Sequence, residues 1–175
     1  MDRDILRTEI QRLIEENRLN YCLECGKCSA ICPMNQFYEG LEYRYSPRGV
    51  IEKVLFNPES VYDNEDIWFC LACNRCTEKC PCGIDFHSFM TSLRTLLISN
   101  GFDKYGHFCY RCKSYIMPKT EYEILIQGDK GRILTPLLQL CDRCKKEEFI
   151  ESLYIYSSWP KKNKREVKGY EKEKG

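Results

Sequence analysis

The sequence predicts a mainly α-helical protein in which helices surround two cysteine-rich loops, followed by a small module built on a β-hairpin. Two observations support this prediction. The 13 cysteines of the 175 residues fall into groups with regular spacing. Between the groups, apolar residues recur with the period of an amphipathic α-helix. A chain this small buries only a modest core, so we expect metals to contribute to its stability.

Cysteine in such numbers indicates either disulfides outside the cell or metal and redox centres inside it. Residues 1–20 intersperse charges with single apolar residues, so we expect no export signal. No run approaches the about 18 apolar residues of a membrane-spanning helix. The formal net charge of +1 gives no general argument for a nucleic-acid partner. The sequence therefore predicts a cytoplasmic protein with metal-bound cysteines and no transmembrane segment.

The first two cysteine groups repeat one pattern. In residues 22–33 and again in residues 70–81, four cysteines are separated by two, two and three residues and followed by proline. This is the run found in two-cluster ferredoxins, where three cysteines bind one 4Fe–4S cluster and the fourth ligates the other cluster. Zinc or inert core cysteines would explain one such run more easily than two. We therefore expect two 4Fe–4S clusters.

Crossed ligation assigns four cysteines to each cluster. The first cluster takes Cys22, Cys25, Cys28 and Cys80. The second cluster takes Cys70, Cys73, Cys76 and Cys32. Cys82 belongs to neither set, and we interpret it as a buried or cluster-shielding thiol in preference to a reactive one.

Three amphipathic helices are expected around the loops, the first over about residues 4–19. The second begins with Ser46 as N-cap and Pro47 at the first helical position, and it ends at Asn57. Its apolar stripe consists of Val50, Ile51, Val54 and Leu55. The third is capped by Asp85 and stops at Asn100. Its apolar face consists of Phe86, Phe89, Met90, Leu93, Leu96 and Leu97. We interpret these stripes as core in preference to a partner groove.

The last third of the chain predicts a separate metal module. Its candidate ligands are Cys109, Cys112, Cys141 and Cys144. Two such pairs are typical of a four-cysteine zinc site. Residues 121–127 and 132–140 are predicted as strands around a turn at 128–131, and a helix follows Cys144. We interpret the module as a zinc-ribbon or treble-clef-like finger with one structural zinc ion. A rubredoxin-like single iron, and unligated or disulfide-bonded cysteines, remain alternatives.

Three regions follow from these assignments. Residues 1–104 form the two-cluster domain, residues 105–158 the zinc module, and residues 159–175 a charged flexible tail. Residues 1–108 carry 12 Lys and Arg against 16 Asp and Glu, whereas residues 109–175 carry 15 against 10. We expect the first region to meet cationic partner surfaces and the module with its tail to meet an acidic one.

Residues 15–98 resemble the C-type iron–sulfur subunit of heterodisulfide reductase. The resemblance rests on CLECGKCSAICP, on YSPRGVIEKVLFN and on DIWFCLACNRCTEKCPCGIDFHSFMTSLR. Similar domains occur in iron–sulfur subunits of succinate dehydrogenase-like and glycerol-3-phosphate dehydrogenase-like enzymes. The resemblance implies a helical ferredoxin-type fold and an electron relay between a flavin-containing subunit and a catalytic iron–sulfur subunit. Cys82 and the C-terminal module depart from the family's pattern.

Catalytic residues are not expected. No G-x-G-x-x-G fingerprint follows a strand, and neither His87 nor His107 lies in an acid–base constellation. The sequence therefore favours a non-catalytic electron-transfer subunit that does not bind nucleic acid. The alternative is an iron–sulfur binding or sensory protein that recognises nucleic acid or protein through the zinc module and basic tail.

Overall fold

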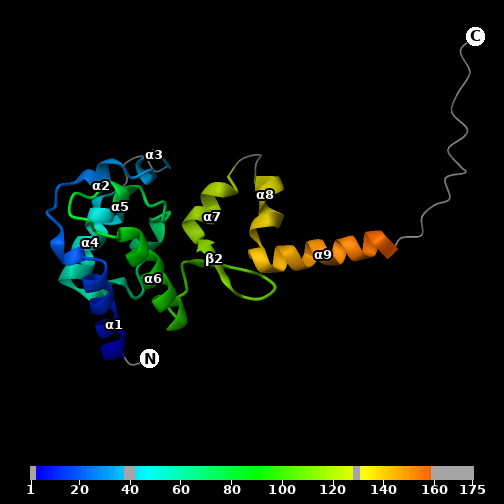
Figure 1. Ribbon diagram of the computed structural model, residues 1–175, viewed down its shortest axis with the longest axis horizontal. Helices are drawn as coiled ribbons and strands as arrows, with labels where there is room; N and C mark the ends of the chain where they lie inside the picture. The colour runs from blue at the N-terminus through cyan, green and yellow to red at the C-terminus, as the bar shows by residue number, and fades with distance from the viewer. Residues whose placement is uncertain (1–2, 38–41, 128–130, 159–175) are drawn as a thin grey trace, which may run out of the picture.

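The computed structural model describes residues 3–37, 42–127 and 131–158 (Figure 1). The charged tail predicted at 159–175 lies outside the described residues. The described chain is mostly helical with one two-stranded sheet. In chain order the elements are α1 (Arg3–Glu16), η1 (Leu19–Tyr21), α2 (Lys27–Ala30), α3 (Met34–Phe37), η2 (Tyr43–Tyr45), α4 (Pro47–Phe56), η3 (Pro58–Val61), η4 (Glu65–Phe69), α5 (Arg75–Glu78), α6 (Phe86–Ser99), β1 (Gly106–Phe108), β2 (Tyr115–Pro118), α7 (Lys119–Leu125), α8 (Gly131–Leu138) and α9 (Asp142–Ser158).

The three predicted amphipathic helices are present as α1, α4 and α6, and their apolar faces form the larger core. Residues from all three helices are fully buried there, among them Leu6, Ile10, Val50, Val54, Phe89, Met90 and Leu93. The predicted stripe is wrong at Leu55, whose side chain is 38% exposed, because the last turn of α4 rotates it out of the core. Among the described residues, no helix is both long and apolar enough to span a bilayer.

The predicted helix boundaries follow from capping. Ser46 Oγ accepts a hydrogen bond from the backbone N–H of Gly49 at 3.1 Å, and Asp85 Oδ1 accepts one from the backbone N–H of Ser88 at 3.0 Å. Such bonds satisfy backbone donors that have no partner inside the helix. Gly49 also has a steric role, since a Cβ at this position would overlap the carbonyl oxygen of Tyr43. The segment before α4 can therefore pack directly on its first turn.

The C-terminal module differs from its prediction. The antiparallel sheet pairs β1 with β2, placing Gly106 opposite Pro118, so it surrounds the first cysteine pair. The strands predicted at 121–127 and 132–140 are wrong, because these segments are covered largely by helices α7 and α8. Short apolar runs fit both the helical and the extended period, and packing selects the helix: the ring of Tyr122 stacks on His107 at 3.9 Å between centroids.

The helix predicted after Cys144 is confirmed as α9, which extends away from the N-terminal helices in Figure 1. Its first turn contributes Cys144 to a second, smaller core that also contains Cys109 and Leu140. The two cores are separate clusters of buried residues. Metal-ligand candidates thus lie beside the larger core and inside the smaller one.

Candidate iron–sulfur and metal sites

The two cysteine loops of the N-terminal region have the same backbone conformation. Glu24 and Ala72 occupy equivalent positions and have positive φ angles of 52° and 49°. Gly26 and Asn74 are also equivalent, with φ angles of 74° and 67°. Positive φ is uncommon for residues other than glycine, and such strained backbone conformations cluster at functional sites. Each loop leads into a one-turn helix, and these two helices, α2 and α5, pack against each other.

Two cavities lie beside the loops, and each is lined by cysteines of both motifs. The first cavity is lined by Cys22, Cys25, Cys28, Cys76, Cys80 and Cys82. The second cavity is lined by Cys32, Cys70, Cys73 and Cys76. The fourth cysteine of each motif therefore lies with the first three cysteines of the other motif, which is the arrangement that crossed ligation requires. Cys76 borders both cavities.

The pKa values of these thiols depend on cysteines that line the same cavity. Burial raises the pKa of Cys32, and the nearby Cys70 and Cys73 raise it further. Burial likewise raises the pKa of Cys76 to about 12, with Cys70 adding to the effect. Crowded half-buried thiols resist ionisation because each thiolate disfavours the next. Positively charged iron removes that penalty, so the cavities suit a cluster better than free thiols.

Polar groups of the backbone and of one arginine also fit an iron–sulfur cluster. The N–H of Ala72 points at Cys70 Sγ over 3.3 Å, so the strained loop donates to a ligand sulfur. Arg48 borders the first cavity. Its Nε is buried and has no hydrogen-bond partner within the described residues. A cluster sulfur would satisfy this donor, and an unpaired buried N–H is otherwise costly.

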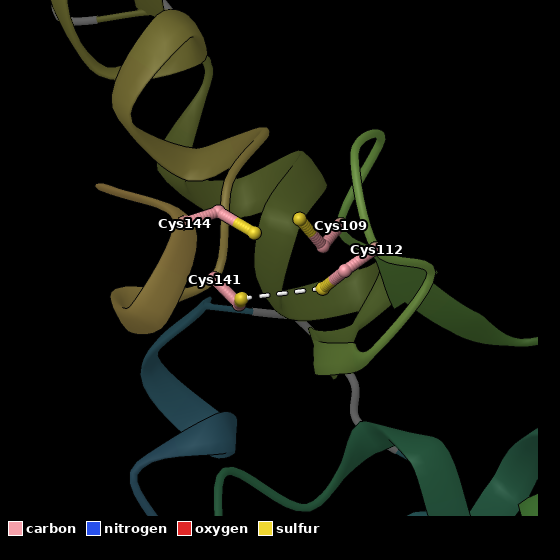
Figure 2. Close-up of side chains that lie close together, drawn as sticks. All are labelled: Cys109, Cys112, Cys141 and Cys144. Atoms are coloured by element: carbon pink, nitrogen blue, oxygen red, sulfur yellow. Dashed lines mark hydrogen bonds between the residues drawn. The ribbon is translucent and has the colours of Figure 1, made fainter. Parts of the chain in front are cut away.

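The four cysteines of the C-terminal module converge, as Figure 2 shows. All four sulfur atoms lie within 4.8 Å of one another, and the Cys112 and Cys141 sulfurs are 3.5 Å apart. A tetrahedral site with zinc–sulfur bonds of about 2.3 Å has sulfurs about 3.8 Å apart. One pair comes from the turn between β1 and β2, and the other from the start of α9.

The pKa values of two cysteines in this site favour the binding of a cation. Hydrogen bonding with the Ser114 side chain, whose hydroxyl oxygen lies 3.2 Å from the Cys112 sulfur, lowers the pKa of Cys112 to about 5. Burial instead raises the pKa of Cys144 to about 12. One sulfur is therefore readily ionised while another needs a metal to become a thiolate. A divalent ion supplies that charge, and thiolate ligands suit zinc.

The two histidines take no part in the four-cysteine site. His107 Nε2 lies 3.0 Å from the carbonyl oxygen of Leu138, and its ring stacks on Tyr122. His87 borders the second cavity. Cys82 borders the first cavity in addition to Cys80, which agrees with its interpretation as a thiol beside a cluster.

Sequence reasoning missed Arg94. This residue lies on α6 with only 4% of its surface exposed, and it donates hydrogen bonds to the carbonyl oxygens of Ile67 and Cys70. A signal was available, because Arg94 interrupts the predicted apolar face between Leu93 and Leu97. A charged residue at a core position of an amphipathic helix is rarely buried unless it has a specific partner.

Comparison with known proteins agrees with this geometry. Residues 18–84, which hold both loops and most of the lining of both cavities, match the 4Fe-4S dicluster domain family. The chain is an iron–sulfur protein similar to the C-type subunit of heterodisulfide reductase. The C-type subunit of a ferredoxin:CoB-CoM heterodisulfide reductase from Methanosarcina acetivorans is 42% identical over 57 residues, covering 33% of this chain and 21% of the relative.

A second relative is a C-type iron–sulfur subunit of the CoB–CoM heterodisulfide reductase of Methanocaldococcus jannaschii. It is 31% identical over 80 residues, or 46% of this chain and 40% of the relative. The chain thus spans about a fifth of one relative and two fifths of the other. The similarity is therefore to part of the iron–sulfur subunits of heterodisulfide reductases. The four-cysteine module lies beyond the residues of the dicluster domain.

Proposed function

We propose that this chain relays electrons through two 4Fe–4S clusters between a flavin-containing subunit and a catalytic subunit of a heterodisulfide reductase-like complex. The observation that supports this most directly is the pair of cavities, each lined by three cysteines of one motif and the fourth of the other. Cys22, Cys25, Cys28 and Cys80 hold the first cluster. Cys70, Cys73, Cys76 and Cys32 hold the second. Each cluster, when bound, supplies one-electron redox chemistry.

The positions of the cysteines determine where electrons enter the chain, pass between the clusters and leave. Cys76 and Phe86 border both cavities, so the two clusters lie close together in this arrangement. Cys25 and Cys73 are exposed, which brings one ligand of each cluster to the molecular surface. Two surface openings joined by a short internal path are what a relay between two partners requires. The remaining ligands are half-buried and shield each cluster from water.

A docking position for one partner lies beside the first cavity. Leu23, a residue of the first loop, borders this cavity and is 75% exposed, and the neighbouring Tyr21 is 68% exposed. Exposed apolar side chains of this kind mark interaction surfaces when they lie together. A partner covering them would exclude water from the first cluster and bring its own redox centre close.

The C-terminal module is proposed to bind one structural zinc ion through Cys109, Cys112, Cys141 and Cys144. The four sulfurs fill a closed tetrahedral site, which leaves no open position for a substrate. Separate hydrophobic cores support a boundary between residues 1–104 and 105–158. In this role the module contributes a rigid surface for a partner subunit and carries no electrons.

The proposal is tested with the anaerobically purified chain, alone and with its co-purifying subunits. The chain alone is expected to take up one electron per cluster reversibly and to show no turnover with thiol, disulfide or nicotinamide substrates. Added flavin-containing and catalytic subunits should oxidise and reduce it. Substrate conversion by the isolated chain would contradict the relay. Salt-dependent nucleic-acid binding with clusters that exchange no electrons would instead indicate the binding or sensory protein.

A further inference from the structure

Arg94 is held rigidly against the segment that leads into the second cysteine loop. Its Nε donates to the carbonyl oxygen of Ile67 at 3.2 Å. Its Nη2 donates to the same oxygen and to the carbonyl oxygen of Cys70, both at 2.5 Å. The guanidinium carbon also lies 5.6 Å from the ring centroid of Trp68. The cation is therefore fixed beside the first ligand of the second cluster.

The charge of Arg94 is only weakly compensated. Within the described parts of the chain, no carboxylate lies within ion-pair distance of its guanidinium. The nearest acidic influence is Glu121 on α7, whose pKa burial raises and Arg94 lowers. Arg94 is therefore a buried cation close to Cys70 whose charge no ion pair neutralises within the described residues.

The first cavity also has a cation at its wall, Arg48, whose buried Nε has no hydrogen-bond partner within the described residues. Arg48 is paired with Glu24 at 2.8 Å, and 31% of its side chain is exposed. Lys27 also borders that cavity but is exposed, so water screens it. Both loops expose one cysteine, so solvent access does not separate the two sites. The main electrostatic difference is the buried, weakly compensated charge of Arg94.

We propose that Arg94 is a positioning residue that raises the reduction potential of the second cluster. Reduction moves one electron from a donor, a reduced flavin in the complex, onto a cluster, so the cluster gains one negative charge and the donor loses one. A buried cation stabilises the more negative state because the low local dielectric screens it little. The charge of Arg94 therefore makes the second cluster easier to reduce.

The C-terminal module takes part in this arrangement. Tyr115 on β2 and Glu121 on α7 belong to the module, and both interact electrostatically with Arg94. The Trp68 ring, which Arg94 faces, also meets the Tyr115 ring edge-on at 6.0 Å. The docked module thus covers Arg94 and keeps water from screening it. Its carboxylate at Glu121 offsets part of the positive field.

The test is a potentiometric titration of the full chain, loaded with clusters, followed by electron paramagnetic resonance. Arg94→Gln should lower one of the two midpoint potentials and leave the other unchanged. Arg94→Lys, which retains the charge, should stay close to wild type. Glu121→Gln at pH 8 should shift the same potential upward. Arg48→Gln is the matched control at the first cavity and should not move that potential. Cys73→Ser, which alters the second cluster's spectrum, identifies the signal.

Three outcomes would overturn the inference. They are unchanged potentials in a fully loaded Arg94→Gln variant, a shift confined to the first cluster, or an equal shift in the lysine variant. If Arg94→Gln fails to bind clusters, Glu121→Gln decides: an unchanged potential would show that buried charges on this side of the loop do not reach the second cluster, and would overturn the inference. The inference rests on the proposed two-cluster relay. The two can fail separately. A single cluster per chain would contradict the relay. Two clusters whose potentials do not change in the Arg94 variants would contradict only the role of Arg94.

Discussion

The hydroxyl group of Thr120 donates a hydrogen bond to the carbonyl oxygen of Trp68 over 2.7 Å. Thr120 lies in the first turn of α7 in the C-terminal module, whereas Trp68 is a buried residue of η4 just before the second cysteine loop. The contact joins the four-cysteine module to the segment that supplies Cys70. The module is therefore docked on the N-terminal region beside the second cysteine loop.

Replacing Thr120 by valine should weaken this docking. The substitution keeps the shape of the side chain but leaves the Trp68 carbonyl oxygen without its donor, which costs about 1–3 kcal/mol. Hydrogen exchange should then accelerate about tenfold in α7 and η4. Thr95→Val is the matched control, because the Thr95 hydroxyl bonds only within α6 and is exposed. Unchanged exchange in η4 would contradict a docking role.

Crossed ligation predicts an effect at a distance in the sequence. Cys80→Ser should damage the cluster held by Cys22, Cys25 and Cys28, and spare the cluster of its own motif. Cys82→Ser, two residues away at the same cavity, is the control and should leave both clusters in place. Iron content and the resonance signals of the reduced chain report the result. Loss of the second-motif cluster in Cys80→Ser would refute the assignment.

The metal content of a fully loaded chain should be about eight irons and one zinc. Replacing Cys141 and Cys144 by serine should release the zinc and unfold the module, because four thiolates hold a structure with a very small core. Both clusters should survive, since no ligand is shared. The check is elemental analysis together with visible absorbance. A ninth iron with a single-iron spectrum would make the module a third redox centre.

The cap of α6 predicts a stability effect with a defined pH dependence. Hydrogen bonding by the Ser88 N–H lowers the pKa of Asp85. The carboxylate's contribution is therefore complete above its unfolded value of about 3.9 and is lost as the pH falls through the lower folded value. At pH 7, Asp85→Ala should cost about 1 kcal/mol of local stability. Hydrogen exchange in the first turn of α6 measures the loss.

The Asp85→Asn variant is the informative control for the cap. An amide oxygen also accepts the bond from Ser88, so Asp85→Asn should keep most of the protection at pH 7. If the alanine and asparagine variants exchange equally fast, the bond between Asp85 and Ser88 does not stabilise the helix start.

Sequence alone was sufficient where the signal is local. The spacing of the cysteines indicated an iron–sulfur protein, and the 4Fe-4S dicluster match over residues 18–84 confirms it. Ser46, Pro47 and Asp85 marked helix starts correctly, because a cap acts within one turn of its own residue. The apolar stripes of α1, α4 and α6 identified most of the core for the same reason: a helical period is visible without knowledge of what covers it.

Tertiary structure decided the features that depend on distant contacts. Residues 119–125 became a helix because Tyr122 stacks on His107 and Thr120 bonds to Trp68, neither of which a short apolar run reveals. The position of Arg94 on the apolar face is visible in sequence, but its hydrogen-bond partners are not, since they come from η4 and the loop after it. Cysteine spacing predicts the ligands, but only the folded chain places Arg94 against the carbonyl oxygen of Cys70 and Arg48 at the wall of the first cavity. Electrostatic fields depend on distance and burial, which the order of residues does not contain.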